Sequence, residues 1–177
     1  LVSDAVAAPA SLVLKRQERT VLFADIRGFT AWSEGHSPEE TVAMLNRYFE
    51  TAERVWADSS LIKTEYTGDE IMGVFPAAAD AVRIAQALRL ALGRLLAEFN
   101  LGLGIGVHTG PVIEGLMGGA EVKAYRFVGD TVNTAKRICS EARRDQVLLS
   151  EATFAQAGSL ARVGPIFELG MKGKAEP

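Results

Sequence analysis

The sequence predicts an α+β fold in which one mixed β-sheet is covered by helices. Short runs rich in β-branched and aromatic residues alternate with longer segments whose apolar residues recur at helical spacing. Tight turns that contain glycine separate two pairs of expected strands, which is typical of hairpins. Hairpins supply antiparallel neighbours and the intervening helices cover the sheet, so a layered α+β sandwich is expected.

Composition and charge fit a single globular domain. The chain has 177 residues, of which 48% are apolar and 23% are charged, and its net charge is -3. The negative charge disfavours nucleic acid as a partner, and a single cysteine excludes a disulfide framework or a cysteine-based zinc site. No apolar run reaches the ~18–20 residues that a membrane span needs. We therefore expect no nucleic-acid partner, no membrane contact by this segment and a cytoplasmic location.

The first residues indicate a piece of a longer protein. The chain begins Leu1-Val2 without a methionine, and in residues 1–17 the basic residues follow the apolar run, unlike those of a signal peptide. We interpret residues 1–17 as a linker from a missing upstream region and residues 18–177 as the domain. Membrane anchoring of the full-length protein through missing regions stays open.

Local signals place the elements. Residues 20–26 form a β-rich run that ends in an acid and a glycine turn, which predicts a strand. Ser37, followed by a proline and two glutamates, marks the start of a helix that is expected to reach about residue 57. Its predicted buried face comprises Val42, Leu45, Phe49, Ala52 and Val55.

The rest of the chain continues the alternation of strands and helices. Alternating glycines at 102, 104 and 106 indicate close approach of another backbone. Ser150 is expected to cap a short helix. The other expected elements are a hairpin of strands 61–66 and 70–75, a helix over 78–99, strands over 101–107 and 112–116 around a turn at 108–111, a helix over 130–143, and strands over 147–149 and 167–169.

Two aspartates stand out by their positions. Asp25 ends the first predicted strand, and Asp69 lies in the hairpin turn. If adjacent strand ends bring the two carboxylates together, they repel unless a cation lies between them, and oxygen ligands suit Mg²⁺ or Mn²⁺. The alternative is that both are ordinary turn aspartates, which are common.

Two further segments bear on phosphate chemistry. The backbone N–H groups of a glycine turn at Gly28, Phe29 and Thr30 suit phosphate oxygens. Asn133 and Arg137 are four residues apart, so they share one helix face. Such a pair suits a ribose and a charged phosphate, although a solvated polar face would account for it equally well.

The motifs together are more specific than any one of them. They are FADIRGFT at 23–30, TGDEIM at 67–72, GIGVHTG at 104–110, GDTVNTAKR at 129–137 and KGK at 172–174. In this order they closely resemble the class III nucleotidyl cyclase catalytic domain, over residues 18–177. The resemblance implies a ferredoxin-like palm core and a head-to-tail homodimer with composite sites. It also implies an upstream sensory or regulatory domain.

The same resemblance implies an activity and its residues. A nucleoside triphosphate would become a 3′,5′-cyclic nucleotide and pyrophosphate, assisted by two Mg²⁺ or Mn²⁺ ions. Because Pro111 stands where some members have a phosphate-binding arginine, Arg27, Lys172 or Lys174 would carry more of that contact. The implied roles are metal binding by Asp25, Asp69 and the Ile26 carbonyl, ribose orientation by Asn133, transition-state stabilisation by Arg137, and phosphate binding by Lys172 and by the turn at Gly28, Phe29 and Thr30.

The base-reading positions are unusual. By the resemblance they are Glu65, where guanylyl cyclases also carry Glu, and Arg126, which matches neither purine class. A carboxylate accepts from the N1–H and amino group of guanine and an arginine donates to O6, so GTP is favoured over ATP. The alternatives are an ion pair between Glu65 and Arg126 that reads the base weakly, and an adenylate cyclase with atypical base-reading residues.

Two other functions compete with an active cyclase. A catalytically silent nucleotide-binding dimerisation module would share the fold, but Asp25, Asp69, Asn133 and Arg137 are all present. A diguanylate cyclase shares the palm core, yet the second glycine and closing phenylalanine of its motif are missing after Asp69.

Overall fold

The computed structural model describes residues 14–119, 121–158 and 164–166. Within them, six strands form one sheet in the order β2-β3-β1-β4-β5, with β6 parallel to β4 and the other neighbours antiparallel. The sheet is therefore mixed, as expected. The strands are β1 (Lys15–Arg27), β2 (Lys63–Thr67), β3 (Glu70–Phe75), β4 (Gly102–Gly118), β5 (Lys123–Val128) and β6 (Gln146–Leu149).

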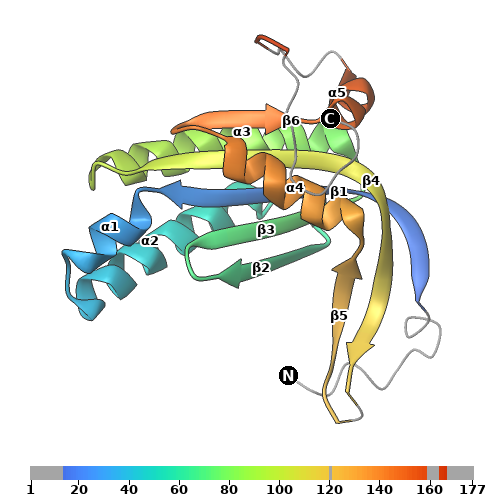
Figure 1. Cartoon of the computed structure of the whole chain (residues 1–177), viewed down its shortest axis with the longest axis horizontal. Coiled ribbons are helices and arrows are strands. Elements are labelled where there is room, and N and C mark those ends of the chain that lie inside the picture. Colours follow the sequence, from blue (N-terminus) through green and yellow to red (C-terminus); the bar gives the residue numbers. More distant parts are fainter. Residues whose placement is uncertain (1–13, 120, 159–163, 167–177) are drawn as a thin grey trace.

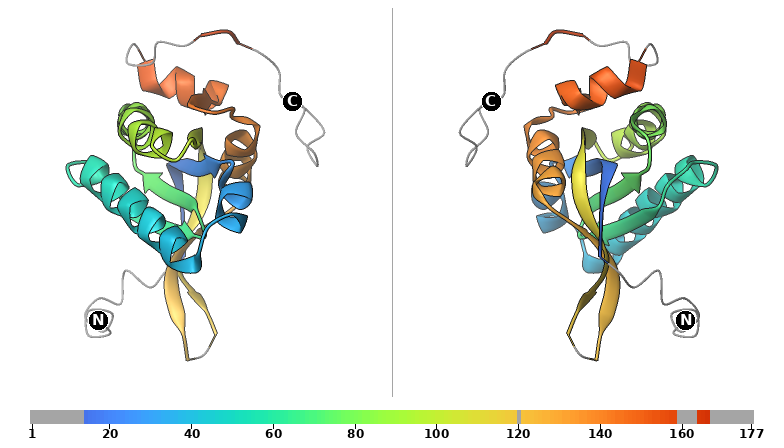
Figure 2. Two further views of the ribbon diagram at one scale, coloured as in Figure 1. Left: turned by 90° about the vertical axis from the view of Figure 1, so that its left-hand side faces the viewer. Right: turned by 90° about the vertical axis from the view of Figure 1, so that its right-hand side faces the viewer.

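Helices cover both faces of this sheet (Figures 1 and 2). The main apolar core lies between one face and the helices α2 and α3, and a second apolar cluster lies under α4 on the other face. The succession β1-α2-β2-β3-α3-β4 is the ferredoxin-like arrangement, which confirms the predicted fold class. The helices are α1 (Phe29–Glu34), α2 (Pro38–Trp56), α3 (Ala78–Ala97), α4 (Asp130–Glu141) and α5 (Glu151–Ala157).

Helix α2 begins where the sequence predicts but buries a different face. The Ser37 hydroxyl accepts from the Glu40 backbone N–H and the Glu40 carboxylate accepts from the Ser37 N–H, a complete capping box. Met44, Tyr48, Ala52 and Trp56 form the buried stripe, whereas Val42 is 55% exposed. The prediction that Val42 is buried was therefore wrong. The residues spaced four apart through Tyr48 include larger side chains than the predicted face, and burying them removes more apolar surface from water.

Strand β4 is one continuous strand where two were predicted around 108–111. Pro111 pairs with Glu18 of β1, and its carbonyl accepts from the Thr131 hydroxyl of α4 at 2.7 Å. The N and O of one residue point to the same side of a strand, so the missing N–H of Pro111 faces α4 and no bond of the β1 ladder is lost. The prediction of a break was wrong for this reason.

Strand β5 was not predicted, although Tyr125, Phe127 and Val128 are residue types that favour strands. It pairs with the far end of β4, and this hairpin projects from the body of the molecule in Figure 2. Tyr125 and Phe127 turn back onto the second apolar cluster. Arg126, between them in the alternation, is exposed.

Of the glycines in β4 at which close approach of another backbone was predicted, Gly106 confirms it, whereas arginine side chains lie against Gly102 and Gly104. A Cβ on Gly106 would lie 2.1 Å from the backbone N of Cys139, and one on Gly104 would lie 2.3 Å from the Arg27 guanidinium. Helix α4 therefore rests on bare backbone at Gly106, and Gly104 leaves room for the Arg27 side chain. Burial raises the pKa of the Cys139 thiol to about 12, which fits the prediction that this cysteine is a packed small residue.

Helix α1 was not predicted, because the sequence indicates only a glycine turn there. The remaining helices and strands agree with the predictions in kind, with shifts of a few residues at their ends. Strand β1 begins at Lys15 and thus includes residues 15–17, which the sequence assigned to a linker. The predicted strand 167–169 and Lys172 lie outside the described residues. Among the described helices, none is both long enough and apolar enough to cross a bilayer.

Candidate active site

Asp25 and Asp69 lie together at one end of the sheet. The β1–β3 ladder ends at the pair Ala24 and Ile71, so Asp25 passes beside the start of β3. Asp69 occupies the two-residue turn before β3, where Gly68 supplies the positive φ of 62° that such turns need. The Asp69 carboxyl lies close enough to the Asp25 carboxyl and to the Ile26 backbone N–H for both groups to shift its pKa.

This juxtaposition is electrostatically costly without a cation. Burial, with the Asp25 carboxylate beside it, raises the pKa of Asp69 to about 7. Within the described residues, no third acidic, histidine or cysteine side chain joins the pair to make a larger metal-binding cluster. The two carboxylates form a hard, incomplete oxygen donor set, which fits Mg²⁺ or Mn²⁺ with water or phosphate as the remaining ligands.

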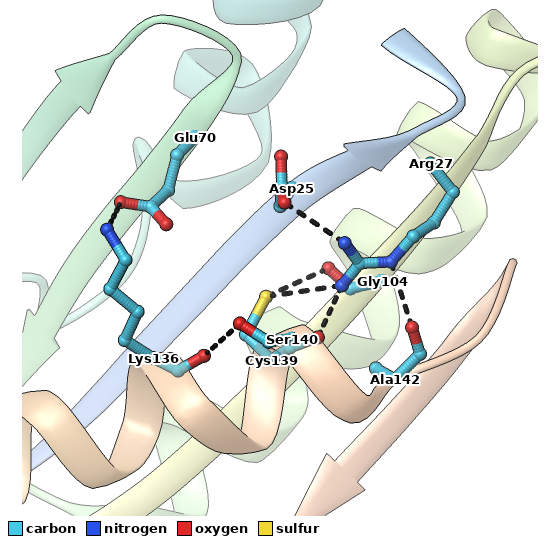
Figure 3. Close-up of polar contacts among 8 residues, drawn as sticks. All are labelled: Asp25, Arg27, Glu70, Gly104, Lys136, Cys139, Ser140 and Ala142. Carbon is cyan, nitrogen blue, oxygen red and sulfur yellow. Dashed lines mark hydrogen bonds and ion pairs between the residues drawn. The ribbon is translucent and has the colours of Figure 1, made fainter. Parts of the chain in front are cut away.

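Arg27 fixes the position of Asp25 (Figure 3). Its Nη1 donates to Asp25 Oδ2 at 3.0 Å, its Nε donates to the Ala142 carbonyl at 2.8 Å, and its Nη2 donates to the Cys139 carbonyl. The carbonyls belong to the C-terminal end of α4, which a cation stabilises. Arg27 therefore joins α4 to the carboxylate pair, and its expected contribution to phosphate contact stays a prediction.

The expected phosphate turn is the start of a short helix. Gly28 has a φ of 91° and precedes α1, with Phe29 and Thr30 in the first turn. Phe29 packs partly against the main core, and Thr30 is exposed. The segment follows Asp25 and Ile26 directly, so it lies at the same end of the sheet.

Asn133 and Arg137 lie on the side of α4 that is not packed against the sheet. Asn133 is exposed and Arg137 is half-buried, one helical turn apart as predicted. Between them, Lys136 donates to Glu70 of β3 at 3.0 Å and lies 5.9 Å from the centre of the Phe23 ring. The Lys136–Glu70 pair thus ties α4 to the strand that follows Asp69 (Figure 3).

The two base-reading candidates do not pair with each other. Within the described chain, the ion pair of Glu65 is with Lys63, at 2.8 Å, and Arg126 is exposed on β5. The alternative of a closed Glu65–Arg126 pair was therefore wrong. Lys63 also donates to the backbone carbonyl of Tyr125, next to Arg126.

A sequence model of the adenylate and guanylate cyclase catalytic domain matches residues 13–176. The chain belongs to this family.

Individual cyclases agree with that assignment. Adenylate cyclase 1 of Rhizobium meliloti (strain 1021) is 36% identical over an alignment of 177 positions, which covers 90% of this chain and 26% of that protein. Guanylate cyclase 32E of Drosophila melanogaster is 34% identical over an alignment of 147 positions, which covers 76% of this chain and 13% of that protein. The chain thus spans about a quarter or less of the length of these relatives.

Solved cyclase structures share the fold. The guanylyl cyclase Cya2 superposes with a TM-score of 0.85 at 33% identity, covering 91% of this chain and 88% of that one. The adenylyl cyclase CyaB from P. aeruginosa superposes with a TM-score of 0.77 at 27% identity, covering 82% of each chain. The α+β architecture of this cyclase domain is therefore that of cyclase catalytic domains.

Sequence reasoning missed the side chains that hold this cyclase site in place. The role of Arg27 depends on the C-terminal end of α4, about 115 residues away in the chain. Lys63 and Lys136 form cross-element contacts that no local pattern marks. The glycine at 106 was the one local signal that α4 rests close to β4.

Proposed function

We propose that this cyclase domain converts a purine nucleoside triphosphate, with GTP favoured, into its 3′,5′-cyclic nucleotide and pyrophosphate, in signal transduction. The observation that carries the proposal is the meeting of the Asp25 and Asp69 carboxylates. Two half-buried carboxylates destabilise each other, and a divalent cation between them removes that repulsion. The family match over nearly the whole chain supports the same reaction.

The expected cofactors are two Mg²⁺ or Mn²⁺ ions. Asp25, Asp69 and the backbone carbonyl of Ile26 would hold them, since these ions prefer oxygen ligands. When bound, such ions lower the pKa of a coordinated hydroxyl and offset the charge of phosphate oxygens. Arg27 keeps one Asp25 oxygen engaged and leaves the other available.

The remaining groups position the substrate for an in-line displacement. The ribose 3′-oxygen bonds to the α-phosphorus, the bond to the bridging oxygen breaks, pyrophosphate leaves, and the hydroxyl proton passes to solvent. Asn133 would orient the ribose, and the Arg137 guanidinium would offset the charge that develops on the α-phosphate. The β- and γ-phosphates would be contacted by the backbone of Gly28, Phe29 and Thr30 and by Lys172, which lies outside the described residues.

Two copies of the chain would build each site. Asp25 lies on the sheet, whereas Asn133 is exposed on the side of α4 that does not pack against the sheet. A nucleotide in contact with both sets is therefore best bridged between two protomers, which supports a head-to-tail homodimer. An upstream sensory domain would then act by changing how the two protomers meet.

GTP is favoured over ATP because Glu65 accepts from both donors of the guanine edge. Adenine presents an acceptor at N1, which a carboxylate repels. The second candidate, ATP, is supported by the 36% identity to a protein named adenylate cyclase. Guanylyl and adenylyl names both occur among the similar structures, so the choice rests on Glu65 itself.

Product analysis tests this function. The purified chain is incubated with GTP or ATP, each with Mg²⁺ or Mn²⁺, and the products are separated by chromatography. We expect cyclic GMP and pyrophosphate in equal amounts, a smaller yield of cyclic AMP, and a specific activity that falls on dilution because the site is shared. Nucleotide binding without cyclic product would identify a silent dimerisation module instead, and cyclic diguanylate would identify a diguanylate cyclase.

A further inference from the structure

Lys63 makes two contacts that bring both base-reading strands together. Its Nζ lies 2.8 Å from Glu65 Oε1 on the same strand, and it donates to the Tyr125 backbone carbonyl on β5. Lys63 and Glu65 pair across the β2–β3 ladder with Val74 and Met72, both members of the apolar cluster under α4. Residues two apart on a strand share one face, so the lysine and the glutamate project from the same side of β2.

The environment of this lysine differs from that of an ordinary surface ion pair. The Lys63 side chain is 24% exposed, and its second partner is a main-chain group of another strand. An exposed pair is worth little because both side chains lose freedom and solvent screens the charges. Here β5 already holds the ammonium group, so the Glu65 carboxylate meets a cation that is fixed in advance.

We propose that Lys63 is a positioning residue for purine recognition, holding the Glu65 carboxylate in one orientation and β5 beside it. A carboxylate has about four lone-pair positions, and the Lys63 ammonium group lies against one oxygen, Oε1, at 2.8 Å. The others stay open to the N1–H and amino group of guanine. Because Tyr125 precedes Arg126, the same bond fixes the backbone from which Arg126 projects. This inference rests on the proposed function and deepens it by naming what sets the choice of purine.

The test measures affinity for two nucleotides that lack the attacking hydroxyl. Binding of 3′-deoxy-GTP and 3′-deoxy-ATP to the full chain is titrated by calorimetry in the presence of Mn²⁺. Lys63→Met keeps the aliphatic stem and removes the ammonium group. We expect 3′-deoxy-GTP to bind about tenfold more weakly, the order of one charge-assisted hydrogen bond, while affinity for 3′-deoxy-ATP changes by less than about twofold.

Three variants separate positioning from a merely structural role. Lys63→Arg keeps a cation within reach of both partners and is expected to retain the guanine preference. In a Glu65→Gln background, Lys63→Met is expected to have no further effect on the affinity ratio, because it acts through the carboxylate. Lys123→Met removes an exposed lysine from the other end of β5 and is expected to bind both nucleotides as the unmodified chain does.

Each outcome decides the matter. Equal weakening of both nucleotides by Lys63→Met, or an unchanged GTP-to-ATP ratio, overturns the role of Lys63 while the cyclase function stands. An additive effect of the two substitutions also overturns it. If the unmodified chain binds neither nucleotide, the proposed function fails together with this inference.

Discussion

Arg27 and Asp25 lie two residues apart on β1 and form an ion pair with 3.0 Å between Nη1 and Oδ2. The same guanidinium donates to the carbonyls of Ala142 and Cys139 at the end of α4. One side chain thus fixes a candidate metal ligand and also closes a helix end. Gly104 leaves the space in which it lies.

Replacing Arg27 with methionine is expected to destabilise the fold by about 2–3 kcal/mol, because terminal carbonyls of α4 lose a charged donor. Urea unfolding followed by circular dichroism measures this. Arg83→Met is the matched control, since Arg83 is 55% exposed and its ion pair is with Asp80, and its effect is expected to stay within about 0.5 kcal/mol. Equal effects of the two substitutions would show that Arg27 does not hold α4.

The close approach of α4 to β4 predicts a sharp difference between two glycines. Gly106→Ala would drive a methyl group into the backbone of Cys139, so we expect a loss of at least about 2 kcal/mol from overpacking. Gly93→Ala, in the middle of α3, meets only an ordinary contact and is expected to stabilise the protein by about 0.5–1 kcal/mol. Thermal melts of both variants compare them, and a Gly106→Ala protein as stable as the parent would contradict the packing described.

Features set by neighbouring residues could be predicted from the sequence, whereas contacts between distant segments could not. Caps, hairpin turns and apolar periodicity are local signals, so the Ser37 capping box, the turn at Asp69 and the glycines under α4 were predictable. Pro111 misled because its effect depends on which side of β4 its nitrogen faces, and only tertiary structure decides that. The bond from Lys63 to the Tyr125 carbonyl joins residues 62 positions apart, and no pattern in the neighbouring sequence indicates it.

Asp69 predicts the pH dependence of metal binding. Its pKa of about 7 means that the metal-free protein carries a proton there below neutral pH, and metal binding must displace it. Mn²⁺ affinity is therefore expected to fall about tenfold for each pH unit below about 7. The unbound Mn²⁺ signal in electron paramagnetic resonance, followed from pH 5.5 to 8.5, measures this, and a flat profile would disprove it.

Asp69 also affects how the free energy of unfolding depends on pH, and in the direction opposite to that of a carboxylate whose pKa is lowered by folding. The folded-state pKa of Asp69 is raised above its ordinary value of 3.8, so the folded state binds the proton more tightly than the unfolded state does. Without metal, the free energy of unfolding should therefore fall as pH rises from about 4 to about 7. Asp69→Asn should remove most of that fall, and a fall that persists in this variant would mean that another group causes it.

Glu65 predicts a change of substrate. Glu65→Lys replaces the acceptor for guanine with a donor that suits N1 of adenine, so the ratio of kcat/KM for GTP to that for ATP should drop by at least about tenfold. Initial rates of cyclic GMP and cyclic AMP formation give this ratio. Glu50→Lys makes the same charge change on an exposed position of α2 and should leave the ratio unchanged. An unaltered ratio in Glu65→Lys would show that Glu65 does not read the base.

The claim on which the rest depends is that Asp25 and Asp69 bind divalent cations together. The most direct measurement is Mn²⁺ titration of the unmodified chain, Asp25→Asn, Asp69→Asn and the exposed control Asp58→Asn, with cyclic nucleotide formation followed in the same samples. We predict that each site variant loses more than about tenfold in affinity, since even outer-shell partners are worth that much, and forms no product. Full Mn²⁺ affinity and full rate in a folded Asp69→Asn protein would contradict the account.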